Sequence, residues 1–152
     1  MVMTCGKRII RQNTFETNSS SVHSLVFSNE GREPSQFVLE DGYIWVSLGD
    51  FGTDLCIYDT QYDKLSYLMT CLYYIGGYSI EGIYNSFEFI AIEAAICNYT
   101  GAKGIKINPY SNGYIDHQSA PYGSIEIINV WNDDEVINFV FNKHISLKTD
   151  CD

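Results

Sequence analysis

Short apolar stretches bounded by turn-forming residues predict several strands along the chain. The clearest covers residues 43–48, which are rich in β-branched and aromatic side chains and lie between the Asp-Gly pair at 41–42 and the Gly-Asp pair at 49–50. Such side chains pack well on a pleated surface, whereas Asp and Gly favour turns. Similar stretches predict strands at 22–27, 104–108, 124–131 and 145–148, and residues 55–58 form either a short strand or a turn.

Apolar residues at helical spacing predict a first helix that begins near Thr60 and ends at the glycine pair 76–77. The apolar residues that carry this pattern are Tyr62, Leu65, Met69, Leu72 and Tyr73. A shorter helix is predicted over residues 135–142, because the segment Asn-Asp-Asp at 132–134 caps it and places acidic residues at the positive end of the helix dipole.

A further helix is predicted over residues 86–98, with Gly101 at its C-terminal end. The residues expected on its core-facing side are Phe87, Ile90, Ala91, Ala94 and Cys97. Strands and helices follow one another without strict strand–helix–strand alternation. We therefore expect an α+β fold, with a small mixed sheet packed against two to three helices, in a single domain of 152 residues.

Composition supports an ordered protein and restricts its partners. Apolar residues make up 45% of the chain and aromatic residues 14%, which excludes a disordered chain. The formal net charge of −10 repels nucleic acid and attracts basic protein surfaces, so simple DNA binding is disfavoured.

The five cysteines are widely spaced, and the sequence has no Cys-x-x-Cys pair that would indicate a zinc knuckle. Without a signal-like N-terminus or a long apolar stretch, we expect a cytoplasmic protein of a host bacterium.

A dense polar cluster directly precedes the first predicted strand. Residues 11–23 hold an arginine, an asparagine, a carboxylate, a run of serines and a histidine, with apolar segments on both sides. Flanking apolar segments favour an ordered loop, where binding and catalytic groups tend to lie. The alternative is a turn with caps, in which the serines bind nearby backbone groups.

This segment resembles the opening of a family of small, mostly uncharacterised proteins from bacteriophages and mobile elements. The resemblance covers Arg-x-Asn-x-Phe-Glu-Thr-Asn-Ser-Ser-Ser-x-His-Ser-Leu at 11–25, Gly-Tyr-Ile-Asp-His-Gln-Ser at 113–119 and the segment 141–150. The middle of the chain is similar only around 49–52 and 64–67. The resemblance implies a phage or mobile-element origin but no particular reaction, and the small, acidic, tyrosine-rich profile is similar to that of anti-CRISPR proteins.

Two histidines within these motifs suggest acid–base chemistry on RNA. His23 and His117 are the candidate base and acid for cleavage of a phosphodiester, because imidazole exchanges protons near neutral pH. Arg11 would stabilise the developing negative charge, and Glu16 would orient a histidine or act as an alternative base. The residues expected to bind substrate are Asn18, Ser19, Ser20, Ser21, Asp116 and Gln118.

Other roles for the same residues stay open. In one alternative the histidines are structural. In another, Glu16, His23, Asp116 and His117 bind zinc or manganese, although no His-x-x-x-His spacing supports a metal site. We predict no metal and no cofactor. A set of tyrosines would either stack on bases or anchor a protein interface, and we favour the interface. These tyrosines are Tyr73, Tyr74, Tyr78, Tyr84, Tyr110, Tyr114 and Tyr122.

These observations lead to a hypothesis of function with two alternatives. The leading hypothesis is an inhibitor of host defence that cleaves the guide RNA of a CRISPR-Cas effector, which would be its partner. In the first alternative the acidic chain is not an enzyme and occupies the nucleic-acid cleft of a Cas nuclease such as Cas9. In the second, Arg11 and the serine-rich segment bind the phosphate of a nucleotide signal.

Overall fold

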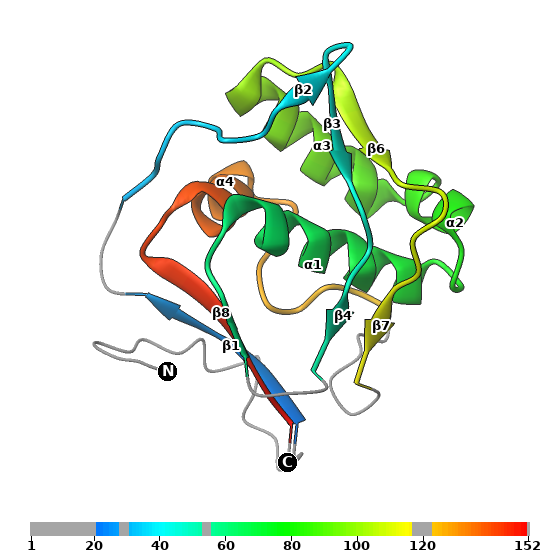
Figure 1. Ribbon diagram of the computed structural model, residues 1–152, viewed down its shortest axis with the longest axis vertical. Coiled ribbons are helices and arrows are strands. Elements are labelled where there is room, and N and C mark those ends of the chain that lie inside the picture. Colours follow the sequence, from blue (N-terminus) through cyan, green and yellow to red (C-terminus); the bar gives the residue numbers. More distant parts are fainter. Residues whose placement is uncertain (1–20, 28–30, 53–55, 117–122, 152) are drawn as a thin grey trace.

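The computed structural model describes residues 21–27, 31–52, 56–116 and 123–151 (Figure 1). Within these residues the chain forms four helices and three small sheets, and the predicted α+β class is confirmed. None of the helices found in the described ranges is long and apolar enough to cross a membrane. The strands are β1 (Ser21–Phe27), β2 (Leu39–Glu40), β3 (Tyr43–Val46), β4 (Asp50–Phe51), β5 (Cys56–Tyr58), β6 (Gly104–Ile107), β7 (Tyr114–Ile115) and β8 (Ile145–Cys151). The helices are α1 (Gln61–Ile75), α2 (Ile80–Tyr84), α3 (Phe87–Thr100) and α4 (Asp133–Phe141).

The two ends of the described chain pair with each other. β8 is the central strand of a sheet in the order β1-β8-β5 and runs antiparallel to both neighbours. The register places Ser21 opposite Cys151 and Leu25 opposite Leu147. Leu25 and Leu147 are both buried, so one face of this sheet covers the core.

Two parallel segments form the other edge of the molecule. β3 continues into β4 and β6 continues into β7, and the pairs β3–β6 and β4–β7 are both parallel. Between the paired stretches the free backbone amides bind side chains instead: Gly49 N donates to Thr70 Oγ1 of α1 at 3.0 Å. Within β7, Ile115 N donates to the Tyr74 hydroxyl at 3.0 Å, while the amides on either side of it donate to the segment of β4. Side chains of α1 thus satisfy backbone groups that strand pairing leaves without a partner.

Helix α1 is the central element of the core. Thr60 caps its N-terminus by accepting a hydrogen bond from Asp63 N, as the sequence pattern predicted for this boundary. Every residue from Lys64 to Leu72 is buried, because other elements cover α1 on all sides. The buried polar side chains on α1 therefore need partners inside the protein, and Gln61, Lys64, Ser66 and Thr70 all have them.

Helix α3 has the predicted ends but buries a different face. Ser86 caps its start and Gly101, in the left-handed conformation, ends it. The prediction for the core-facing side was wrong for Phe87 and Ile90, whose side chains are 76% and 55% exposed, and for Ala94, which is exposed as well. The buried residues are instead Phe89, Ile92, Ala95 and Ile96. Because α3 is apolar around most of its circumference, helical periodicity alone did not distinguish its two apolar faces.

The prediction of a strand at residues 124–131 was wrong as well. The segment that the structure describes there is irregular, although Ile125, Ile127 and Val130 are buried. Side chains satisfy its backbone, since Asn129 N donates to Glu135 Oε1 at 3.0 Å. Apolar alternation therefore reflected a buried loop, because a strand also requires a partner strand.

Sequence reasoning missed α2 and the two-residue strands β2, β4 and β7, which are too short to show a period.

Candidate functional site

The two sequence motifs adjoin the same end of the molecule. β1 begins at Ser21, where the N-terminal motif leads into it, and the second motif runs through β7 to Asp116 and beyond. Figure 1 shows the start of β1 and the ends of β8, β4 and β7 together at the bottom of the molecule. We call this region, made of Ser21–His23, Cys56, Phe51–Gly52, Ile115–Asp116 and Thr149–Cys151, the motif end.

Backbone pairing joins the strands of the motif end in two sets, β1-β8-β5 and β4-β7. Thr149 of β8 lies opposite His23 of β1 on one side and opposite Cys56 of β5 on the other. Its hydroxyl is fully buried and donates to the carbonyl of Cys56 at 3.5 Å. On the neighbouring pair, Asp116 N donates to the carbonyl of Phe51 at 3.1 Å. The chain then runs from β4 to β5 within a few residues, so these strand ends are held at one side of the core.

Ring contacts add a second connection across the motif end. The Phe51 ring of β4 packs edge-to-face on Tyr58 of β5, with ring centroids 5.0 Å apart, and on Tyr67 of α1 at 5.1 Å. Burial, followed by interaction with the Cys56 thiol, raises the pKa of the Tyr58 hydroxyl. Tyr58 therefore stays protonated at neutral pH and acts as a hydrogen-bonding group, not as a base.

Most of the predicted site residues lie outside the described residues. His23 and Ser21 lie in β1, where the structure gives their register but not their side chains. Asp116 is half-buried at the end of β7. The predicted site residues that are not described are Arg11, Glu16, Asn18, Ser19, Ser20, His117 and Gln118. The structure thus places the start of β1, the strand of His23, and the end of β7, the strand that precedes His117, toward the same end of the molecule (Figure 1). A meeting of the two imidazoles stays a prediction.

The described residues form no candidate metal site. The described residues contain no group of three or more His, Cys, Asp or Glu side chains placed to hold a metal ion. The alternative site of Glu16, His23, Asp116 and His117 includes residues beyond this description, so it stays an alternative.

The structure also contains a buried cation that the sequence reasoning did not identify. Lys64 of α1 is completely buried, and its Nζ donates to the main-chain carbonyls of Asn142 at 3.0 Å and Ile145 at 2.8 Å. The Phe139 ring lies 5.9 Å from the same nitrogen. Burial lowers the pKa of Lys64 to about 8, against a smaller opposing effect of Asp59. Lys64 holds the turn from α4 into β8, at the opposite end of β8 from the motif end.

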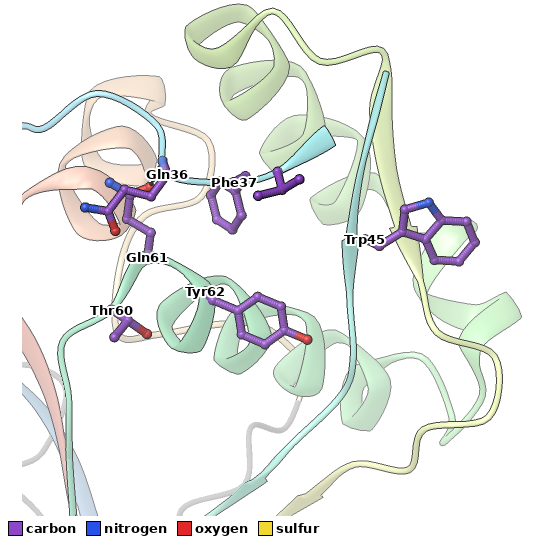
Figure 2. Close-up of a pocket in the computed structure, with 7 residues that line it drawn as sticks. Gln36, Phe37, Trp45, Thr60, Gln61 and Tyr62 are labelled. Atoms are coloured by element: carbon purple, nitrogen blue, oxygen red, sulfur yellow. Dashed lines mark hydrogen bonds between the residues drawn. The ribbon is translucent and has the colours of Figure 1, made fainter. Parts of the chain in front are cut away.

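A pocket of about 300 Å³ lies beside the start of α1, away from the motif end (Figure 2). It is lined by Gln36, Phe37, Val38, Trp45, Thr60, Gln61 and Tyr62. Gln61 connects the segment before β2 to the helix, because its amide accepts from Gln36 N at 2.7 Å and donates to Pro34 O at 3.0 Å. None of the predicted site residues lines this pocket.

Comparison of the chain with protein-family models, with curated proteins and with solved structures finds no match.

Proposed function

We propose that this protein is a phage or mobile-element inhibitor of host defence that cleaves the guide RNA of a CRISPR-Cas effector at the motif end. The observation that carries the proposal is topological: the start of β1, which contains His23, and the end of β7, which directly precedes His117, lie toward the same end of the molecule. Pairing of β1 and β5 with β8, the few residues between β4 and β5, and pairing of β4 with β7 give this arrangement. The resemblance of both motifs to phage proteins supports the choice of host defence.

The two histidines would act as an acid–base pair. One imidazole takes the proton of a ribose 2′-hydroxyl, and the oxygen attacks the adjacent phosphorus. The bond from phosphorus to the 5′-oxygen breaks, and the other imidazole donates its proton to that oxygen. The products are a 2′,3′-cyclic phosphate and a 5′-hydroxyl end. Arg11 would neutralise the extra charge on the phosphorus oxygens, and Glu16 would orient one imidazole.

The charge of the chain restricts how RNA reaches the motif end. A net charge of −10 disfavours encounter with free RNA, and Asp50 and Asp116 add carboxylates near the strand ends. A basic effector protein neutralises the phosphates of its guide and attracts an acidic inhibitor. The proposed substrate is therefore guide RNA in its protein complex, and free RNA would be cleaved more slowly.

The test is a denaturing RNA gel after incubation of the protein with a Cas9–guide RNA complex. His23→Ala and His117→Ala should each leave the guide intact, whereas the unaltered chain shortens it. His144→Gln is the matched control, because His144 precedes the far end of β8, which spans seven residues, or about 20 Å at strand spacing. Undiminished cleavage by either alanine variant would rule out the acid–base pair.

The net charge favours a second candidate, a blocker that occupies the basic cleft of the effector without chemistry. The same incubation distinguishes the two, because a blocker leaves the guide at full length while DNA cleavage by the complex is lost. Added salt should weaken such a blocker, since its binding depends on charge.

A further inference from the structure

The outer surface of α2 and α3 exposes large apolar side chains. Tyr78, which precedes α2, is 63% exposed, and Tyr84 at the end of α2 is 40% exposed. Phe87 and Ile90 of α3 are exposed to 76% and 55%, and Ala94 on the same side of α3 is also exposed. We call the surface formed by Tyr78, Glu81, Tyr84, Phe87, Ile90 and Ala94 the α2–α3 face.

This face is the second apolar side of α3. The first side, with Phe89, Ile92 and Ile96, is buried, and α3 makes its main contacts with α4 and β6. A helix that is apolar around most of its circumference normally has both apolar sides covered. Several large apolar side chains exposed along one stretch mark a candidate interaction site, particularly when charged residues lie beside them.

The stretch of sequence that forms the α2–α3 face carries charge of one sign. Residues 65–102 contain three carboxylates, Glu81, Glu88 and Glu93, and no Lys, Arg or His. Glu81 is exposed, and Glu88 is half-buried beside Phe87. Such a surface repels a phosphate backbone and attracts cationic groups. A basic protein is therefore favoured over RNA as its partner.

The aromatic ring of Tyr78 is held in place before any partner binds. Tyr78 has a backbone φ of 64°, in the left-handed region that bulky residues rarely adopt. Its N–H donates to the carbonyl of Tyr73 at 2.8 Å, and its ring packs against Tyr74 and Tyr73 with centroids 5.0 and 6.1 Å apart. A ring that is already ordered loses little entropy on binding, and ordered tyrosines are frequent anchors of interfaces.

We propose that the α2–α3 face docks onto the basic surface of a partner protein, with arginine guanidinium groups stacking on Tyr78 and Phe87 and pairing with Glu81. Guanidinium groups stack on aromatic rings and bind carboxylates, which matches both properties of the face. Only the nature of the partner, a nucleic-acid-handling protein, rests on the proposed function. Figure 1 shows α2 at the right of the molecule at mid-height and the motif end at the bottom, so the two regions are separate in this view.

The test is an NMR titration of the isotope-labelled chain with a short arginine–glycine repeat peptide, and in parallel with an oligouridine of matched length. Peptide should shift the resonances of residues 78–94, and oligouridine should not. The double variant Phe87→Ser, Ile90→Ser should weaken peptide binding at least tenfold. Both side chains are exposed, so the fold should persist, which circular dichroism checks.

The matched control is Trp131→Ser, because Trp131 is 61% exposed and lies beside the exposed carboxylates of Asp133 and Asp134. This variant should bind the peptide as tightly as the unaltered chain. Shifts centred on the first turn of α4, or unchanged affinity in the double variant, would overturn the proposal. Oligouridine binding at residues 78–94 would identify a nucleic-acid surface instead, which also overturns it.

Self-association is tested by sedimentation of the same proteins. A dimer that the double variant dissociates would assign the α2–α3 face to a second copy of the chain and overturn the proposal. The peptide titration contains neither guide RNA nor Cas protein. Its failure is therefore distinguishable from the failure of guide cleavage in the histidine variants.

Discussion

Substitution of Lys64 by methionine should remove a distinctive pH dependence of stability. Lys64 is fully buried, and burial lowers its pKa from the ordinary value of 10.5 to about 8. The folded state therefore releases the proton of Lys64 more easily than the unfolded state does. A difference of this size corresponds to about 3 kcal/mol of unfavourable free energy for folding with the lysine charged, at about 1.4 kcal/mol per pKa unit.

The sign of this pH dependence of stability follows from proton linkage. Between about pH 8 and 10.5 the unfolded chain keeps the proton on Lys64 and the folded chain has released it, so stability rises with pH. Burial of Cys71 acts in the opposite direction, because it raises the pKa of that thiol from 9.0 to about 12 and makes folding less favourable above pH 9. Burial raises the pKa of Tyr67 as well, with an effect that begins near pH 10. The range from pH 7 to 9 therefore isolates Lys64 best.

Urea unfolding at pH 7 and at pH 9 gives the measurement. Over this range Lys64 should contribute a gain of about 1 kcal/mol in the unfolding free energy of the unaltered chain, and Lys64→Met should lack that contribution. The pH dependence contributed by titratable groups that both proteins share cancels when the two are compared. Lys103→Met is the control, because Lys103 is exposed, and it should keep the full pH dependence. Equal pH dependence in Lys64→Met and the unaltered chain would refute the reasoning.

Three further substitutions test how α1, α2 and α3 are connected. Gly82→Ala should cost at least 2 kcal/mol in thermal unfolding, because its Cβ would overlap the carbonyl oxygen of Gly76. Tyr74→Phe should cost about 1 kcal/mol and speed hydrogen exchange at the amide of Ile115, which loses its acceptor. Ser86→Ala removes the N-cap of α3 and should cost about 1 kcal/mol in urea unfolding, whereas Ser86→Asp should retain most of the stability.

Local signals made the boundaries of α1 and α3 predictable from the sequence, whereas α2 was missed and α4 begins two residues earlier than predicted. Thr60 and Ser86 accept hydrogen bonds from backbone amides three residues further on, and Gly101 provides the left-handed residue that ends α3. Each of these features depends on a few neighbouring residues. The buried side of α3 depends on what packs against it, so the periodicity of Phe87 and Ile90 did not determine it.

Long-range pairing explains why the site was only partly predictable. The motifs identified His23 and His117 as candidates from their residue types. The position of the start of β1 and of the end of β7 at one end of the molecule depends on β1 pairing with β8 and on β4 pairing with β7, which lie far apart in the sequence. Lys64 gave no signal, because a lysine in an amphipathic pattern is normally placed on the solvated side. The burial of Lys64 depends on the carbonyls of Asn142 and Ile145, in the turn from α4 into β8, which accept hydrogen bonds from its ammonium group.

Separation of the α2–α3 face from the motif end has a kinetic consequence. If the first binds the effector and the second cleaves its guide, the two steps respond to different substitutions. Phe87→Ser, Ile90→Ser should raise the protein concentration needed for half-maximal guide cleavage while leaving the rate at saturation unchanged. His117→Ala should abolish that rate and leave affinity for the effector intact. A double variant that lowers the saturating rate as much as His117→Ala would mean that both surfaces serve one step, and the division into docking and chemistry would fail.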